Sequence, residues 1–589
     1  MQITINNKKI QVTPGTTIID AARNNGIHIP SLCYKEGFHQ IGSCRICSVE
    51  VEGRATLQAS CMTEVSDGMV VYTNSQKVIQ ARKILYELML SDHSKHCLSC
   101  NRNQNCELQQ LGELLSIYSD NRFHTNSVRE QLDISPSITR DLSKCILCRR
   151  CVTACKNIQG IAILGAQNRG FDTVIAPAMD KSINNARCSF CGQCVVVCPV
   201  GALKETDHIS KVWAAINDPT LRVVFQPAPA VRVALGEMFD YPIGTSVTSQ
   251  LAEAIKLLGA DDTFDTNWGA DLTIMEEATE FLQRAMNVLS GKDAVLPMIT
   301  SCSPGWVKYI ESYYPQLLPH LSTCKSPHMM LGAMVKSYYA EKINIPPEKM
   351  YVVSVMPCTA KKFEISREEM KNNDVPNVDA VITTRELGTM IKQAGIDFRL
   401  LEGKFFDKPM GQSTGAAVIF GTTGGVMEAA IRTVYAIITG RELPFEELHI
   451  PNIIGNEQIR EASLKFENVI DEYKMFEGFE AKIAVTSGLE GAKFLMEQII
   501  AGTSPYHFIE VMGCPSGCIC GGGQPRTDDP EAKTKRMSAL CMEDEGEMVR
   551  HSHLNPAIIN IYKEYLVEPG SHKAHELLHT HYVDRSEEN

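Results

Sequence analysis

The chain has 589 residues, of which 44% are hydrophobic and 21% charged, and its net charge is −12. This composition is typical of folded protein, and the length predicts three to five structural units rather than one. So acidic a chain does not suit nucleic acid or an anionic membrane, since both bind basic surfaces. The N-terminal segment contains no twin arginine or long apolar leader, and the sequence contains no membrane-length apolar run, so we expect a cytoplasmic protein without a signal peptide or membrane span.

Cysteine is the most informative residue type, with 22 copies that are unevenly distributed. In a large chain without an export signal, cysteines are more often metal ligands than disulfide partners. Most of them precede residue 200, so we expect cysteine-rich domains at 1–78, 79–137 and 138–209, followed by a larger domain at 210–589. Strand-like runs alternate with amphipathic helices in the larger domain, which predicts a multidomain α+β and α/β chain.

The segment 1–78 begins with alternating polar and apolar residues that predict two short strands, followed by the helix-like sequence IIDAARNNG. Its four cysteines have the spacing C-x10-C-x2-C-x13-C, which differs from the plant-type ferredoxin spacing. A loop of cysteines with one distant cysteine still suits a small cluster. We therefore predict a ferredoxin-like domain whose 2Fe–2S cluster is bound by Cys33, Cys44, Cys47 and Cys61.

The segment 79–137 contains one histidine and three cysteines in the pattern H-x3-C-x2-C-x5-C. A zinc ion could use the same ligands, and His96, next to Cys97, is an alternative histidine. Because cluster-type spacings follow directly downstream, we prefer a 4Fe–4S cluster with one histidine ligand. The predicted ligands are His93, Cys97, Cys100 and Cys106.

The segment 138–209 contains two runs with the spacing C-x2-C-x2-C-x3-C, and Pro199 follows the second run. This is the bacterial two-cluster ferredoxin pattern, in which the fourth cysteine of each run binds the other 4Fe–4S cluster. Zinc is the alternative, but a duplicated run of four regularly spaced cysteines is not a usual zinc pattern. The predicted ligands of one cluster are Cys145, Cys148, Cys151 and Cys198, and those of the other are Cys188, Cys191, Cys194 and Cys155.

Three stretches of the larger segment carry further motifs: TSCSPGW at 300–306, MPCTAKKFE at 356–364 and EVMGCPSGC at 510–518. The second and third fit the patterns PCxxKxxE and ExMxCxxGCxxG. Together with the four upstream cysteine groups, these motifs resemble the FeFe (iron-only) hydrogenases that carry several accessory clusters. The resemblance extends over essentially the whole chain.

The resemblance implies a two-lobed α/β catalytic domain, with a C-terminal segment like the hydrogenase small subunit, that converts protons and electrons reversibly into dihydrogen. Its H-cluster is a 4Fe–4S cubane joined by one cysteine sulfur, matched here by Cys518, to a two-iron unit bearing carbonyl, cyanide and a bridging dithiolate. Matching positions are Cys358, Cys514 and Cys518 for the cubane, Lys361 for a hydrogen bond to cyanide, and Met356 and Met512 for packing on the two-iron unit.

The resemblance also implies the other cofactors and the partners. The accessory cofactors are one 2Fe–2S and three 4Fe–4S clusters, and the partners are ferredoxin or flavin- and NAD(P)-binding hydrogenase subunits, together with maturation proteins. A hydrogen sensor with low turnover is an alternative, although the sequence shows no added signalling domain. A purely electron-carrying subunit, like that of respiratory complex I, would leave the motifs around Cys358 and Cys514 unexplained.

The stretch 300–306 departs from the family motif, which usually reads TSCCP, with a proton-carrying cysteine before a cubane ligand. Here the pair is Cys302 and Ser303. By strict position Cys302 carries protons and Ser303 stands at the ligand position, although oxygen is a harder donor than an iron–sulfur cluster prefers. Alternatively, the loop shifts so that Cys302 ligates and Ser303 faces the open iron, which would weaken proton delivery. The sequence leaves both arrangements open.

A helix predicted at 271–289 places Glu277, Glu280 and Arg284 on one flank beside an apolar stripe. The spacing by itself favours a solvated flank with a Glu280–Arg284 pair, worth about 0.2–0.5 kcal/mol. The resemblance favours another role, because Glu277, Glu280 and Ser322 match the family's proton relay.

Three further features complete the sequence-based predictions. The Gly-rich stretch 411–432 fits neither the dinucleotide nor the P-loop pattern, so we expect close backbone packing there instead of a nucleotide site. Cys324, Cys520 and Cys541 lack ligand spacing and are predicted to be structural. The charged residues after Leu578 are predicted to be loosely held.

Overall fold

The computed structural model describes residues 1–118, 123, 131–443 and 459–587, so part of the predicted domain 79–137 lies outside the described residues. The chain divides into two compact units. The smaller unit consists of Met1–Asn157, Ala162–Ala186 and Val197–Lys204, and the larger of Ile158–Ile161, Arg187–Val196 and Glu205–Asn589. Residues of the segment 138–209 occur in both units, and the four predicted domain boundaries remain predictions. Within the described ranges, no helix is long and apolar enough to cross a membrane.

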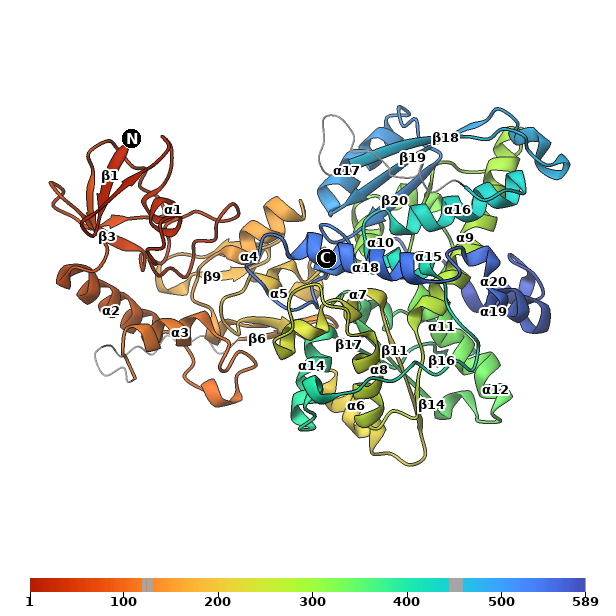
Figure 1. Ribbon diagram of the computed structural model, residues 1–589, viewed down its shortest axis with the longest axis horizontal. Coiled ribbons are helices and arrows are strands. Elements are labelled where there is room, and N and C mark those ends of the chain that lie inside the picture. Colours follow the sequence, from red (N-terminus) through yellow and green to blue (C-terminus); the bar gives the residue numbers. More distant parts are fainter. Residues whose placement is uncertain (119–122, 124–130, 444–458, 588–589) are drawn as a thin grey trace. The chain divides into compact units, whose positions relative to one another are not determined.

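A five-stranded sheet begins the smaller unit (Figure 1). Its order is β2 (Lys8–Gln11), β1 (Gln2–Ile5), β5 (Val70–Tyr72), β3 (Ser48–Val51) and β4 (Gln58–Ala59). The first two strands are antiparallel, and alternate residues Ile3 and Ile5 are buried, as the N-terminal alternation predicts. Helix α1 (Ile18–Arg23) begins after Thr17, whose hydroxyl accepts a hydrogen bond from the backbone of Asp20.

The rest of the smaller unit contains short elements around the other cysteine groups. Its strands are β6 (Leu132–Ile134), β7 (Ile138–Asp141), β8 (Gly165–Gln167), β9 (Val174–Ala176) and β10 (Leu203–Glu205), and its helices are α2 (Gln76–Ser91), α3 (Glu107–Leu114) and α4 (Arg150–Thr153). Buried Arg150 connects these elements, because it pairs with Glu107 at 2.7 Å and donates to the carbonyl of Tyr34 at 3.3 Å.

The larger unit is built on two four-stranded sheets. The first has the order β12 (Asp262–Thr263), β11 (Arg222–Pro227), β14 (Met350–Met356) and β17 (Ala380–Thr383), and all its neighbouring strands are parallel. Strands β11 and β14 consist almost entirely of buried residues, which is typical of a parallel sheet covered on both faces. The strand predicted before Cys358 is therefore confirmed.

The second sheet has the order β13 (Met298–Ile299), β20 (Phe508–Met512), β19 (Glu480–Ser487) and β18 (Ile459–Lys465). Its first three strands are parallel, and β18 is antiparallel at the edge. After buried Ile459, half-buried and exposed residues alternate along β18, as expected for an edge strand with one solvent-facing side.

Helix α9 (Thr266–Leu289) contributes residues to the hydrophobic cores of both sheets. Trp268 and Leu272 belong to the core around the first sheet, whereas Ile274 and Phe281 belong to the core around the second. Asp265 caps the helix by accepting a hydrogen bond from the backbone of Asn267 at 3.0 Å. The two cores agree with the predicted two-lobed α/β architecture.

The remaining elements of the larger unit are shorter and cover these sheets and connect them. The hairpin β15 (Lys371–Asn372) and β16 (Val375–Pro376) is accompanied by α5 (Gln193–Val196), α6 (Ile209–Ile216), α7 (Pro229–Arg232), α8 (Thr248–Leu257), α10 (Pro304–Tyr313), α11 (Pro327–Met334), α12 (Ala340–Lys342), α13 (Lys361–Glu364), α14 (Thr384–Gln393), α15 (Gly415–Val418), α16 (Gly425–Thr439), α17 (Leu489–Ile500), α18 (Ala532–Gly546), α19 (Pro556–Ile561) and α20 (His572–Leu578). In the Gly-rich stretch, a Cβ atom on Gly425 would lie 1.9 Å from the carbonyl oxygen of Ile419, so the backbone packs closely there.

The residues after Leu578 are held more firmly than the sequence predicts. Arg585 donates to Glu311 at 3.0 Å, and the hydroxyl of Tyr582 donates to the carbonyl of Ser322. The prediction of a loose tail is therefore wrong for residues 579–587, because charged side chains there find buried partners that local sequence does not reveal.

Candidate active site and cluster-binding residues

The larger unit contains a cavity at the carboxyl ends of strands from both sheets. Strand β14 runs directly into Pro357 and Cys358, and β20 runs into Gly513 and Cys514, and both pairs line the cavity. Loops that follow parallel strands commonly form ligand sites, because several of them meet at one edge. The predicted residues that line this cavity are Cys302, Ser303, Met356, Cys358, Lys361, Met512, Cys514 and Cys518.

Three of the cavity cysteines lie close enough to perturb one another. Burial, and then neighbouring Cys358, raise the pKa of Cys514 and the pKa of Cys518, the latter to about 12. All three are free thiols. Converging buried thiols cannot ionise together without a compensating positive charge, which a metal centre supplies. The donor set therefore fits an iron–sulfur cubane.

Lys361 reaches the same cavity from the first turn of α13. Its ammonium group donates to the carbonyl of Cys302 at 3.1 Å and pairs with Glu364 at 2.8 Å. Burial would raise the pKa of Glu364, but Lys361 and then His328 hold it well below its usual range. The ammonium group is thereby fixed at the cavity wall, where it can form a charge-assisted hydrogen bond to an anionic ligand.

Cys302 and Ser303 are adjacent in sequence but face different neighbours. Burial, and then the carboxyl group of Glu277, raise the pKa of the Cys302 thiol, which packs against the core of the second sheet. Ser303 stands at the N-cap position of α10, yet its hydroxyl does not cap that helix. Its oxygen instead accepts a hydrogen bond from the backbone of Gly513 at 3.0 Å. The Ser303 hydroxyl is therefore directed at the loop that carries Cys514.

The predicted acidic flank of α9 contains one unusual carboxyl group. Glu277 is fully buried, and among the described residues neither of its oxygens has a hydrogen-bond partner. Burial, and then Glu280, raise the pKa of Glu277 to about 8, so the group is neutral at pH 7. Glu280 forms the predicted pair with Arg284 at 2.6 Å, and also accepts a hydrogen bond from Ser322 at 3.1 Å.

The structure adds three residues that sequence reasoning did not connect with this flank. The hydroxyl of Thr323 donates to Glu280 at 3.1 Å and lies 2.7 Å from Nδ1 of His579. The sulfur of Cys324 lies 3.9 Å from the same carboxylate of Glu280. Adjacency to Ser322 could have indicated Thr323 and Cys324, but no sequence signal indicates His579.

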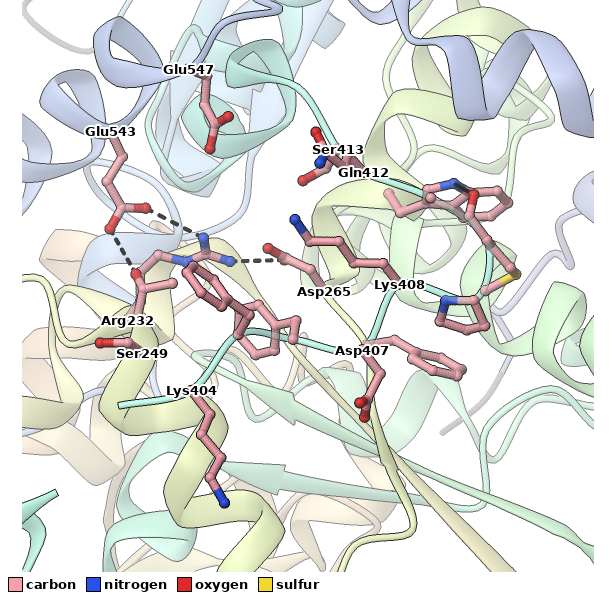
Figure 2. A pocket seen from close by; sticks show the side chains of 18 of the residues that line it. Arg232, Ser249, Asp265, Lys404, Asp407, Lys408, Gln412, Ser413, Glu543 and Glu547 are labelled. Atoms are coloured by element: carbon pink, nitrogen blue, oxygen red, sulfur yellow. Dashed lines mark hydrogen bonds and ion pairs between the residues drawn. The ribbon is translucent and has the colours of Figure 1, made fainter. Parts of the chain in front are cut away.

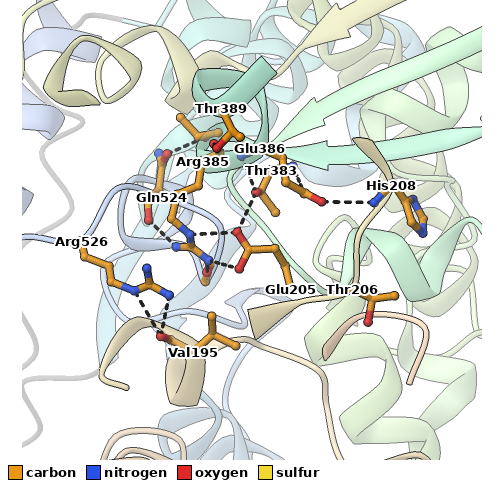
Figure 3. Close-up of polar contacts among 12 residues, drawn as sticks. Val195, Glu205, Thr206, His208, Thr383, Arg385, Glu386, Thr389, Gln524 and Arg526 are labelled. Atoms are coloured by element: carbon orange, nitrogen blue, oxygen red, sulfur yellow. Dashed lines mark hydrogen bonds and ion pairs between the residues drawn. The ribbon is translucent and has the colours of Figure 1, made fainter. Parts of the chain in front are cut away.

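A buried arginine holds the loop that follows Cys518 (Figure 3). Arg385 of α14 donates to the carbonyl oxygens of Gly522 at 2.8 Å and Gln524 at 2.5 Å, and pairs with Glu205 at 3.1 Å. Burial by itself would raise the pKa of Glu205, but Arg385 outweighs it and lowers that pKa to about 2. The carboxylate therefore stays charged and keeps the arginine in place.

The same loop contacts the cysteine run 188–194 within the larger unit. A Cβ atom on Gly522 would lie 2.2 Å from the carbonyl oxygen of Cys191, so glycine permits this close approach. Burial and Cys358 raise the pKa of Cys514 most, and Cys191 raises it further. One cysteine of the predicted ferredoxin-like run thus lies beside the cavity.

The smaller unit brings together two further predicted ligand sets. In the first domain, the backbone of Cys44 donates to the sulfur of Cys33 at 3.5 Å, and the sulfurs of Cys47 and Cys61 are 3.3 Å apart. A separate small cavity is lined by Cys145, Cys148, Cys151 and Cys198. The other 4Fe–4S set combines Cys155 of the smaller unit with cysteines of the larger, and it stays a prediction.

The predicted histidine-containing site surrounds a cavity of about 530 Å³ in the smaller unit. Nδ1 of His93 is buried and has no hydrogen-bond partner among the described residues. Burial, and then Lys144, lower the pKa of His93 to about 4, so its imidazole is neutral and able to bind a metal. The cavity is lined by His93, and not by His96, together with Cys97, Cys100 and Cys106.

Another cavity of the larger unit, about 520 Å³ in volume, was not predicted from the sequence (Figure 2). Its central cation, Arg232, pairs with Asp265 at 2.8 Å and Glu543 at 3.3 Å. Lys404 and Lys408 also line it. Four acidic side chains line the cavity beside its three cations, and Asp265, Glu543 and Asp407 already have basic partners, so this cavity indicates no particular ligand.

Models of known protein families match the parts of the chain that carry these sites. The iron only hydrogenase large subunit, C-terminal domain, matches residues 221–522, and the iron hydrogenase small subunit matches residues 530–585. Upstream, a 2Fe-2S iron-sulfur cluster binding domain matches residues 1–76. The NADH-ubiquinone oxidoreductase-G iron-sulfur binding region matches residues 82–119, and the ferredoxin-like domain of NADH-quinone oxidoreductase subunit 3 matches residues 135–204.

Individual relatives agree with these families. The chain is 48% identical to the NADP-reducing hydrogenase subunit HndD of Solidesulfovibrio fructosivorans, over 99% of each chain. It is 40% identical to iron hydrogenase 1 of Clostridium pasteurianum, over 98% of this chain and 99% of that one. A solved structure of a variant of the FeFe-hydrogenase HydA1 from Chlamydomonas reinhardtii is 43% identical, with a TM-score of 0.59, covering 64% of this chain and 99% of that one.

The protein is therefore an oxidoreductase with N-terminal iron–sulfur ferredoxin-like domains and a hydrogenase catalytic domain. The chain belongs to the FeFe (iron-only) hydrogenase family. The resemblance inferred from the cysteine motifs is confirmed.

Proposed function

We propose that the chain interconverts protons, electrons and dihydrogen at an H-cluster held in the cavity of the larger unit, with electrons passing through accessory clusters. The observation that carries this proposal is the meeting of Cys358, Cys514, Cys518 and Lys361 around one buried cavity. The bound H-cluster would supply the redox chemistry and the open coordination position for hydrogen. The accessory cofactors would be one 2Fe–2S and three 4Fe–4S clusters, one for each upstream ligand set.

The cavity residues would divide the binding of the H-cluster among them. Cys358, Cys514 and Cys518 would hold the cubane, and Cys518 would share its sulfur with the two-iron unit. Lys361 would donate to a cyanide, since its ammonium group is already directed along the cavity wall by Glu364. Side chains Met356 and Met512 are 3% and 2% exposed and line the cavity, so they would exclude water from the two-iron unit.

Cys302 would carry the proton, and Ser303 would stand at the fourth cubane position. The different neighbours of the two residues support this order, because Cys302 lies toward Glu277 and Ser303 toward the Cys514 loop. The test is electron paramagnetic resonance of protein lacking the two-iron unit. If Ser303 ligates, Ser303→Cys should shift the reduction potential of one cluster only, and Ser303→Ala should destabilise that cluster. An unchanged cluster in both variants, with a damaged one in Cys302→Ala, would reverse the assignment.

Protons would pass from Cys302 to Glu277, then through Ser322 and Glu280 toward Arg284 near the surface. A pKa of about 8 suits Glu277 for this role, because a relay group must both accept and donate near neutral pH. The 3.1 Å hydrogen bond from Ser322 to Glu280 supplies a formed step of the path. The relay needs no large movement of the chain at that step.

The physiological electron partner would be a set of flavin- and NAD(P)-binding subunits, with ferredoxin as the other candidate. The full-length likeness to a protein named an NADP-reducing hydrogenase subunit supports the complex. Maturation proteins would have to deliver the two-iron unit. Activity of the isolated chain with reduced ferredoxin, compared with NADPH, distinguishes the two partners: a response to NADPH only when other subunits are added supports the complex.

The deciding experiment for the function is hydrogen evolution from reduced viologen by anaerobically matured protein. Infrared bands of carbonyl and cyanide must first establish that the H-cluster is present. Brisk evolution supports the enzyme and shows that Ser303 is compatible with proton delivery. A fully loaded protein with negligible evolution would contradict the proposal and favour a sensor.

A further inference from the structure

Three metal-binding side chains meet beside the proposed relay, outside every iron–sulfur ligand set. Glu280, Cys324 and His579 each offer one ligand atom, and these atoms all lie within 4.8 Å of one another. They come from helix α9, from the segment after β13 and α10, and from the residue that follows α20. Chain segments so distant in sequence converge here only because the tertiary structure brings them together.

The backbone holds two of these residues in register. Cys324 and His579 form an isolated antiparallel bridge. On either side of it, Thr580 donates to the carbonyl of Thr323 at 2.8 Å, and Lys325 donates to the carbonyl of Leu578 at 2.8 Å. The two side chains are therefore placed by a small strand pairing and not by flexible loops, which favours a preformed site.

The donor atoms of the three side chains face one another. The Cys324 sulfur lies 3.9 Å from Oε2 of Glu280. The hydroxyl of Thr323 contacts both Oε2 of Glu280, at 3.1 Å, and Nδ1 of His579, at 2.7 Å. Nδ1 is therefore the ring nitrogen on the side of the carboxylate. One sulfur, one oxygen and one nitrogen therefore lie within 4.8 Å of one another, with the Thr323 hydroxyl in contact with the oxygen and the nitrogen.

The other ring nitrogen of His579 has a fixed carboxylate partner. Nε2 lies 3.0 Å from Glu276, which is fully buried and also accepts hydrogen bonds from the hydroxyl of Tyr562 at 2.5 Å and the backbone of Gly570 at 2.8 Å. With a proton on Nε2 directed at Glu276, the Nδ1 lone pair faces the Thr323 hydroxyl at 2.7 Å, and a metal ion would replace that hydroxyl as the partner of Nδ1. Carboxylate–histidine–metal arrangements commonly orient their imidazole in this way.

The charge around the site also favours a cation. Burial, and then Glu280, Glu277 and Glu276, raise the pKa of the Cys324 thiol, so three carboxyl groups lie near it, of which Glu277 is neutral at pH 7. Arg284 partly balances one of them. A sulfur, nitrogen and oxygen donor set is typical of zinc and related ions, and it does not suit magnesium or calcium.

We propose that Glu280, Cys324 and His579 form a binding site for one thiophilic divalent cation, Zn²⁺ or Cd²⁺, and that its occupation inhibits hydrogen turnover. The ion would bind the carboxylate of Glu280 and so remove that group from proton exchange. Binding itself stands on the geometry of the three side chains, whereas the inhibition rests on the proposed relay. The two parts can be measured separately.

The test uses anaerobically matured protein and Cd²⁺. Bound cadmium is counted after gel filtration, its ligands are identified by X-ray absorption at the cadmium edge, and hydrogen evolution from reduced viologen is followed in parallel. We expect one ion with mixed sulfur, nitrogen and oxygen ligands, together with inhibition. Paramagnetic resonance and infrared spectra should show that the iron clusters remain intact.

Substitutions of the proposed ligands, with a control elsewhere, test whether the bound ion occupies this site. Cys324→Ser and His579→Gln should each weaken both binding and inhibition by roughly tenfold or more, since each removes a ligand. Cys541→Ser, which alters an exposed cysteine outside the site, should leave both unchanged. Two site variants are used so that misfolding of one does not decide the result.

The outcomes separate this inference from the proposed function. Equal cadmium binding by wild type and both site variants would overturn the site. Tight, variant-sensitive binding without inhibition would keep the site but overturn its link to proton transfer through Glu280. Failure of the metal-free, fully loaded wild type to evolve hydrogen would contradict the proposed function and not the metal site.

Discussion

Replacing Glu277 by glutamine should block proton delivery while leaving the cavity intact. The substitution keeps the shape of the side chain but removes the group that gains and loses the proton. Because the pKa of Glu277 is raised to about 8, the protonated form exceeds the ionised form about ten to one at pH 7. The wild-type carboxyl group is therefore mostly protonated, and so uncharged, at pH 7.

The expected loss of rate follows from the proposed role of Glu277 as a proton-transfer group. A positioned acid–base group commonly contributes about a hundred- to ten-thousand-fold in rate, or about 2.7–5.5 kcal/mol at roughly 1.36 kcal/mol per tenfold. The rate of hydrogen evolution by Glu277→Gln should therefore be lower than the wild-type rate by a factor within that range. In the wild type, evolution should also decline as pH rises through about 8, since the donating form is lost, and this limb should be absent from the variant.

The assay is evolution from reduced viologen between pH 6 and 10, after infrared spectroscopy has shown equal loading of the H-cluster. Thr279→Val is the matched control, because it lies on the same helix and replaces with a methyl group only a hydroxyl that donates to the carbonyl of Met275 at 2.7 Å. Wild-type rates in a fully loaded Glu277→Gln protein, with an unchanged pH profile, would refute the relay assignment.

Three further predictions concern the cluster ligands and the loop beside the cavity. Cys518→Ala should abolish hydrogen evolution while the paramagnetic signals of the accessory clusters persist; normal evolution would contradict the bridging role. Arg385→Met should lower the thermal stability of the protein, because it leaves buried Glu205 uncompensated at a cost of about 3–5 kcal/mol, and calorimetry that finds no shift would exclude this. His93→Ala should alter the signal of one 4Fe–4S cluster, whereas His96→Ala should not; the opposite result would transfer the ligand to the second histidine.

Much of the molecule could be predicted because the relevant information is local. Three ligands of a cubane lie on one tight turn, so spacings such as those of Cys145, Cys148 and Cys151 specify the chemistry directly. The same holds for the strand before Cys358, where a run of buried β-branched residues fits a parallel sheet. Lys361 could be placed beside Cys358 because both belong to one short motif.

The sequence by itself determined the family and the order of the motifs, and it predicted the cluster-binding cysteines, since all of these depend on spacing along the chain. Only the tertiary structure placed His93, and not His96, at the cavity lined by the three cysteines, directed Cys302 and Ser303 to different neighbours, and placed His579 beside Glu280. Such choices depend on which distant segments cover a side chain. The pKa of Glu277 is raised because the surrounding elements exclude water from it, and no pattern within α9 encodes that burial.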